Sequence, residues 1–286
     1  MFVAAGLAFV GRALLHGIHD GAFHQLSWGW VAAAGVVAIA TMTYIAARWS
    51  TAARLVGADL PVGRAIPLYY QGEVGKYIPG ALWAVLGRGE LATRTGIARS
   101  ASYASVASSL AALYLGGALA SAMLLPLALS HSGVGLAVVG VLAFLVVGLG
   151  ALHPAVVRRG VAFVERVSRR KLNVTVPSWR DGVMLVVGYL PAWAGVGVAQ
   201  WFCVRALGLH APIAHVAFAS AVAWCAGFLA IPAPGGIGVR ESVFVLTSGM
   251  AHNDAAAAAL LARLAFVVAD GSGAALGALW MTRRTR

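Results

Sequence analysis

WGWVAAAGVVAIATMTYIAARW, residues 28–49, is a run of 22 residues with a single charged side chain, Arg48. An α-helix needs about 20 mainly apolar residues to cross the hydrocarbon core of a bilayer. Tryptophan is enriched where a helix passes through a membrane interface, and this stretch begins and ends with Trp. The stretch therefore predicts a transmembrane helix.

The whole chain shares this apolar character. Of its 286 residues, 60% are hydrophobic and only 10% are charged, whereas soluble domains carry about 25% charged residues. Further apolar stretches of spanning length occupy residues 1–17, 101–125, 133–152, 183–204 and 254–281. The first lacks a basic leader and a cleavage site, which favours a span over a signal peptide. We expect an all-α polytopic membrane protein, one domain over residues 1–286, with about six full transmembrane helices.

The net charge of +12 does not indicate a nucleic-acid partner, because the basic residues follow the loops. Lys and Arg concentrate in residues 48–100, residues 153–182 and the C-terminal tail, whereas 18–27 and 126–132 contain none. Basic loops face the cytoplasm, so the pattern predicts a multi-pass protein of a bacterial inner membrane with both termini inside. Residues 154–170 place apolar and basic residues at helical spacing, which predicts an amphipathic interfacial helix.

Two apolar segments are broken by proline and glycine. Residues 60–92 contain Pro61, Pro67 and Pro79, and residues 213–250 contain the run PAPGGIG. The helical pieces on either side of each break are mostly too short to span a bilayer. We expect two re-entrant or broken hairpins, the first entering from the cytoplasmic side and the second from the opposite side, with two thin spans as the alternative. Paired broken segments of this kind are typical of inverted-repeat transporters.

Charged residues gather at these breaks and in the last span, at positions where a charge costs about 2.5–3.5 kcal/mol on insertion scales. They are Glu73, Lys76, Arg240, Glu241, Arg263 and Asp270. One interpretation is that they form internal pairs between helices. The other is an anion site, in which the helix N-terminus after the glycine-rich break and Arg240 bind a phosphate. Lys76 then adds a mobile positive charge and Arg88 a forked phosphate donor.

The sequence gives no sign of catalytic machinery. It contains no HExxH or CxxC motif, and Cys203 and Cys225 both lie in apolar segments as small buried side chains. The histidines at 16, 19 and 24 are expected in a hydrated loop. We therefore predict no metal, no cofactor and no catalytic residue, and a transporter instead of an enzyme.

Two stretches carry a resemblance to a known family. GEVGKYIPGALWAVLGR (72–88) resembles the G-x-x-x-K-Y-[LI]-P-G-x-x-W…R stretch of the lysylphosphatidylglycerol synthase transmembrane family, and PAPGGIGVRE (232–241) resembles its P-x-P-G-G-[LI]-G-x-R-E stretch. Arg263 is similar to an arginine in the last helix of that family, which includes the membrane half of the multiple peptide resistance factor. No soluble aminoacyltransferase domain follows the last span, so the resemblance does not imply synthesis of an aminoacyl lipid.

The resemblance implies a flippase-like translocase of an anionic lipid or a polyprenyl-phosphate-linked lipid, working by alternating access. The residues that it places at one gate are Glu73, Lys76, Tyr77, Pro79, Gly80, Trp83 and Arg88. Those at the other gate are Pro234, Gly235, Gly236, Gly238, Arg240 and Glu241. The rival interpretations are a membrane enzyme of lipid-linked glycosyl or aminoacyl transfer and an accessory subunit of a glycosyltransferase. The oligomeric state stays open.

Overall fold

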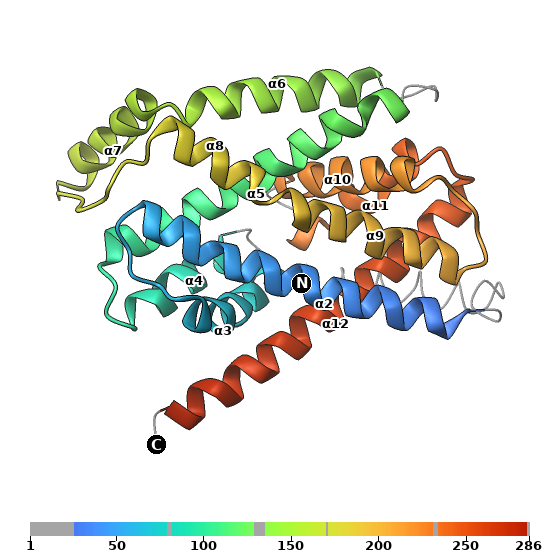
Figure 1. Ribbon diagram of the computed structural model, residues 1–286, viewed down its shortest axis with the longest axis horizontal. Coiled ribbons are helices and arrows are strands. Elements are labelled where there is room, and N and C mark those ends of the chain that lie inside the picture. Colours follow the sequence, from blue (N-terminus) through green and yellow to red (C-terminus); the bar gives the residue numbers. More distant parts are fainter. Residues whose placement is uncertain (1–25, 79–81, 129–134, 170, 231–233, 285–286) are drawn as a thin grey trace.

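The computed structural model describes residues 26–78, 82–128, 135–169, 171–230 and 234–284. Every regular element in these ranges is a helix (Figure 1). The predicted first span, 1–17, lies outside the described residues, as do Pro79 and Gly80.

Within the described ranges, four helical stretches are long and apolar enough to cross a membrane. They are α2 (Trp28–Leu55), α5 (Arg99–Ala128), the pair α8 (Trp179–Val187) and α9 (Leu190–Ala206), and α12 (His252–Arg284). Each contains one of the stretches that the sequence predicts. The break between α8 and α9 falls just before Pro191, which occupies the first turn of α9, where a missing N–H costs nothing. The expectation of a polytopic all-helical membrane protein is confirmed.

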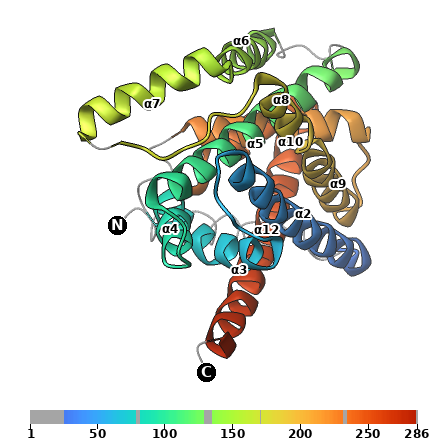
Figure 2. The same cartoon turned by 60° about the vertical axis from the view of Figure 1, so that its left-hand side comes forward.

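From residue 135 on, the predicted span 133–152 forms one helix, and the chain bends sharply where that helix ends. Helix α6 (Gly135–Ala151) is followed by α7 (Pro154–Ser168), and the pair is bent by 74°. The His153 ring caps α7 by accepting a hydrogen bond from the Ala155 N–H. No residue of α7 is buried, and the helix extends away from the bundle (Figure 2). The location of α7 on a membrane surface stays a prediction, as does the total of about six spans.

The first broken segment is a helical hairpin. It consists of α3 (Val62–Glu73), the 3₁₀ turn η1 (Val74–Tyr77) and α4 (Trp83–Thr93). Pro61 precedes α3 in extended conformation, and Pro67 lies inside the helix. Helices of 12 and 11 residues are about 18 and 16 Å long, which is too short to span a bilayer. The hairpin packs against α2, α5 and α12.

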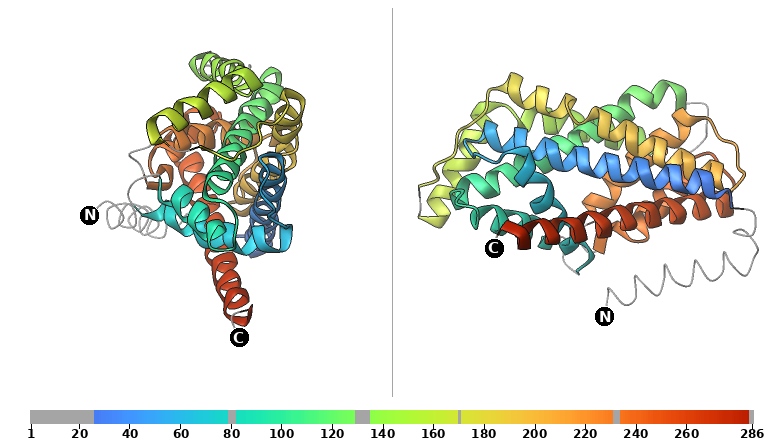
Figure 3. Two further views of the ribbon diagram at one scale, coloured as in Figure 1. Left: turned by 90° about the vertical axis from the view of Figure 1, so that its left-hand side faces the viewer. Right: turned by 60° about the horizontal axis from the view of Figure 1, so that its bottom comes forward.

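The second broken segment is also a hairpin, made of α10 (Ile213–Leu229), η2 (Pro234–Gly236) and α11 (Val239–Thr247). Gly235, Gly236 and Gly238 have φ of 57°, 68° and 85°, which glycine adopts at little cost. The two hairpins occupy opposite ends of the bundle, and their tips η1 and η2 are in contact near its middle while α12 passes both (Figures 1 and 3). The membrane face from which each hairpin enters stays a prediction.

Buried aromatic side chains hold the scaffold around the hairpins. The Trp49 indole N–H donates to the Ser105 hydroxyl at 3.0 Å, which joins α2 to α5. The Trp193 indole N–H donates to the Leu113 carbonyl at 2.7 Å, which joins α9 to α5. Because lipid offers no hydrogen-bond partner, such internal bonds allow these side chains to be buried at membrane depth.

Closing the first hairpin requires a glycine at position 72. A Cβ added there would lie 2.7 Å from the Arg88 backbone nitrogen and 3.0 Å from its Cα, so backbone would have to move. We expect Gly72→Ala to lower the free energy of unfolding by about 1–3 kcal/mol, the usual cost of overpacking. Thermal unfolding in detergent measures this. Gly63→Ala on the same helix is the control, since an added Cβ there meets nothing within 4 Å. Equal stability of both variants would contradict this packing.

Candidate functional site

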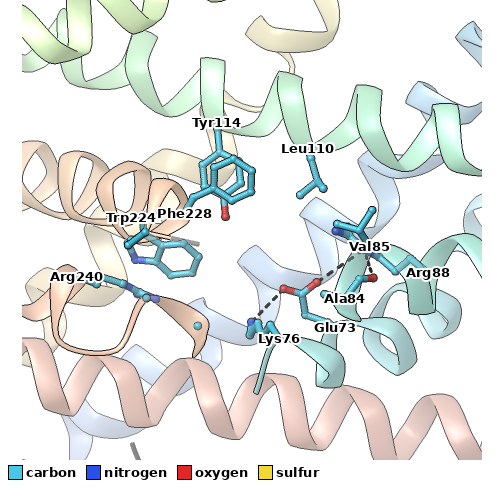
Figure 4. A pocket seen from close by; sticks show the side chains of 14 residues that line it. Glu73, Lys76, Ala84, Val85, Arg88, Leu110, Tyr114, Trp224, Phe228 and Arg240 are labelled. Atoms are coloured by element: carbon cyan, nitrogen blue, oxygen red, sulfur yellow. Dashed lines mark hydrogen bonds and ion pairs between the residues drawn. The ribbon is translucent and has the colours of Figure 1, made fainter. Parts of the chain in front are cut away.

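A cavity of about 120 Å³ lies between the two hairpin tips, with α5 along one wall (Figure 4). A single water needs about 10–15 Å³ on this kind of measure, so the cavity has room for several waters or a small polar headgroup. Six of the residues predicted from the sequence line it: Glu73, Lys76, Arg88, Gly235, Gly236 and Arg240. The cavity therefore brings both broken segments into one site.

Lys76 lies between two carboxylates. Its Nζ is 3.1 Å from Glu73 Oε1 and 2.7 Å from Asp270 Oδ2. Asp270 is on α12, is only 1% exposed, and also accepts a hydrogen bond from the Tyr77 hydroxyl at 2.6 Å. Two ion pairs therefore hold the ammonium group and tie the first hairpin tip to α12, and the mobile positive charge expected at Lys76 stays a prediction.

Arg88 closes the other side of Glu73. Its Nε is 4.0 Å from Glu73 Oε2 and donates to the Ala84 carbonyl at 3.3 Å, while its guanidinium lies 4.9 Å from the centre of the Tyr69 ring. The side chain is 2% exposed. Glu73 is thus shared between Lys76 and Arg88, at the end where α3 meets η1.

The second hairpin tip is also tied to α12. Arg263 forms an ion pair with Glu241, and its Nη2 donates to the Gly235 carbonyl at 3.0 Å. The other Glu241 oxygen accepts the Gly238 N–H at 2.7 Å, so Glu241 caps the first turn of its own helix. At this helix N-terminus the Gly238 N–H is therefore occupied by Glu241, while the expected anion site stays a prediction.

Arg240 differs from the other cations of the site. Its guanidinium lies 3.5 Å from the centre of the Trp224 ring, and no carboxylate among the described residues is within ion-pair distance of it. A cation–π contact leaves the five N–H donors of the guanidinium available. Around the cavity, the described residues supply four cations (Lys76, Arg88, Arg240 and Arg263) and three carboxylates (Glu73, Glu241 and Asp270), so one positive charge has no counterpart.

The chain was compared with known protein families and with curated proteins. Residues 3–269 match the lysylphosphatidylglycerol synthase TM region. The chain belongs to this family. No curated protein matches it at a significant level. The match confirms the resemblance drawn from the two motifs, both of which fall inside the matched range. Membership of the family indicates a membrane protein related to lipid handling.

Six other predicted residues whose side chains the structure describes lie outside the cavity lining. Tyr77, Gly238, Glu241, Arg263 and Asp270 form the layer behind it. Trp83, at the start of α4, is 50% exposed and does not line the cavity. Pro234 belongs to η2, and its side chain is not among those described.

Aromatic residues of α5 and α10 complete the lining, and sequence reasoning missed them. The Tyr114 and Phe228 rings stack with their centres 3.7 Å apart, and Trp224 supports Arg240. These residues lie in uninterrupted apolar helices, where nothing in the sequence distinguishes a cavity-lining ring from a packing one. They form an apolar wall beside the charged wall of this cavity of about 120 Å³, which we call the cation cavity.

Proposed function

We propose that the protein is a flippase-like translocase. It carries the headgroup of an anionic phospholipid or a polyprenyl-phosphate-linked lipid between the leaflets of a bacterial inner membrane. Membership of a membrane-protein family related to lipid handling supports this proposal. Transport, and not catalysis, is the proposed activity, so no residue is assigned a catalytic role.

Arg240 supports the proposal most directly. This cation has no carboxylate partner among the described residues, and it lines a cavity between two broken helices. A partly buried charge without an ion partner is costly, so a ligand that neutralises it is favoured. A phosphate provides the charge and the acceptor oxygens that a guanidinium binds in a forked manner. The acyl chains remain in the bilayer while the cavity takes only the headgroup.

Exchange of ion-pair partners provides the alternating access. Lys76–Asp270 ties the first tip to α12, and Glu241–Arg263 ties the second. A phosphate bound to Arg240 competes with Asp270 for Lys76, which loosens the first tip from α12. The finer features of the architecture belong to the same proposal: about six spans, an inverted repeat and both termini in the cytoplasm.

Lipid exchange in proteoliposomes tests this function. NBD-labelled phosphatidylglycerol in the inner leaflet is protected from added dithionite, and we expect the purified full chain to accelerate its reduction relative to protein-free vesicles. Zwitterionic NBD-phosphatidylcholine should exchange several-fold more slowly, because its ammonium group would lie beside Lys76 and Arg240. Exchange of the anionic lipid no faster than in protein-free vesicles would contradict the proposal.

A further inference from the structure

A second, smaller cavity lies next to the first and shares Trp224 and Arg240 with it. It extends away from the hairpin tip, toward the end at which α10 begins and α11 ends. Gln200 of α9 and Ser220 of α10 line it there. Its volume is about 10 Å³, enough for one water at most. Arg240 stacked on Trp224 therefore separates a roomy cation cavity from a narrow polar chamber.

The chamber contains polar groups that the cation cavity does not use. Gln200 is 5% exposed, and one N–H of its amide donates to the Ala258 carbonyl at 2.9 Å. The Ser220 hydroxyl donates to the Val216 carbonyl at 2.6 Å, which leaves its oxygen able to accept. Polar side chains buried at membrane depth usually face the bundle interior or a water-filled path. The second amide N–H of Gln200 is suited to bind a headgroup phosphate, and the Ser220 oxygen is suited to accept from a headgroup hydroxyl.

A third cavity, of about 170 Å³, lies farther along the same hairpin and is lined by His210, Ser248 and Asp254. Ser248, the C-cap of α11, follows Phe244 by four positions, a rise of about 6 Å. Between this cavity and the chamber lies an apolar layer in which Val216, Phe244 and Ala255 are each at most 2% exposed. The layer separates the polar chamber from the outer cavity.

We propose that the route of the headgroup continues from the cation cavity between α9, α10, α11 and α12. On this route Gln200 and Ser220 form a second headgroup station, and the apolar layer around Phe244 is the closed gate beyond it. The inference rests on the proposed translocation. In this structure the route is shut at two places, the narrow chamber and the Phe244 layer, so the conformation is closed toward the outer cavity.

Thiol accessibility tests the gate without any lipid transport. With Cys203 and Cys225 replaced by alanine, Ser220→Cys and His210→Cys are exposed in sealed proteoliposomes to a negatively charged, membrane-impermeant methanethiosulfonate. We expect fast labelling at position 210 from one membrane face and slow labelling at position 220. Adding Phe244→Ala should accelerate labelling at position 220 at least ten-fold from that same face.

The matched control is Phe218→Ala, a buried phenylalanine of α10 that packs toward α5 and α6 instead of the chamber. It should leave labelling at position 220 slow. If Phe244→Ala does not fold, Phe244→Leu replaces it, with Phe218→Leu as its control. The gate is overturned if the Phe244 variant labels at position 220 as slowly as its Phe218 control does. It is also overturned if that labelling comes only from the opposite membrane face.

Transport tests the second station. Gln200→Leu combined with Ser220→Ala should slow exchange of NBD-phosphatidylglycerol at least ten-fold, and the Phe218 control should exchange at the wild-type rate. A wild-type rate in the double variant would overturn the station. If the wild-type chain moves no lipid but shows the expected labelling, only the proposed translocation fails. If it moves lipid without that labelling, only the route fails.

Discussion

Replacement of Arg240 by alanine should slow exchange of anionic lipid by roughly 10- to 100-fold while the protein stays folded. The loss follows from a charge-assisted hydrogen bond to phosphate, which contributes about 1.5–3 kcal/mol. Stability should fall less, because Arg240 has no carboxylate partner and loses mainly its cation–π contact with Trp224, worth about 0.5–2 kcal/mol. NBD-phosphatidylglycerol exchange and thermal unfolding of the same preparation measure the two effects.

Arg205 provides the matched control for this variant. Its guanidinium also lies over indole rings, 5.8 Å from the centres of both Trp30 and Trp201, but it does not line the cation cavity. Arg205→Ala should keep the wild-type exchange rate. Equal rates in the Arg240 and Arg205 variants, with both proteins folded, would remove Arg240 from the site.

Asp270→Ala should lower the free energy of unfolding by about 3–5 kcal/mol, since it leaves the Lys76 ammonium short of a buried partner. Replacing both members of the pair, as Lys76→Met with Asp270→Leu, should recover most of this stability, because buried ion pairs are often replaceable by apolar groups of similar volume. Exchange of anionic lipid should not recover, because the Lys76 ammonium, which the phosphate bound to Arg240 is proposed to draw away from Asp270, is gone. Thermal unfolding and lipid exchange separate the two roles.

The exposed pair of Glu90 and Arg99, 2.8 Å apart, is the control for Asp270. Glu90→Ala should change stability by no more than about 1 kcal/mol, because exposed ion pairs contribute little. Full lipid exchange in the apolar double variant would show that the Lys76–Asp270 pair only holds helices together. The charges would then be internal pairs between helices and not a headgroup site.

Much of the fold could be predicted from local sequence. Apolar stretches of spanning length located the long helices, and prolines and glycines located both hairpins, because their effects on the backbone are local. The partners of the charges could not be predicted in this way. Tyr77 and Asp270 are 193 residues apart, and only the packing of α12 against the first hairpin brings them together.

The capping of α11 is a different case, because the sequence held a signal for it. Glu241 follows Gly238 at the three-residue spacing of a capping box, with the glycine at the N-cap position. That spacing indicates that the glutamate serves its own helix end. The Gly238 N–H is therefore not free to bind an anion, and Arg240 becomes the main candidate.

A structure of the full chain in nanodiscs that contain phosphatidylglycerol tests the central claim most directly. The account predicts lipid phosphate density in the cavity between the hairpin tips, with its oxygens about 2.7–2.9 Å from the Arg240 guanidinium or the Lys76 ammonium. A cavity without lipid density, with every bound phosphate on the outer surface of the bundle and Arg240 still stacked on Trp224, would contradict it.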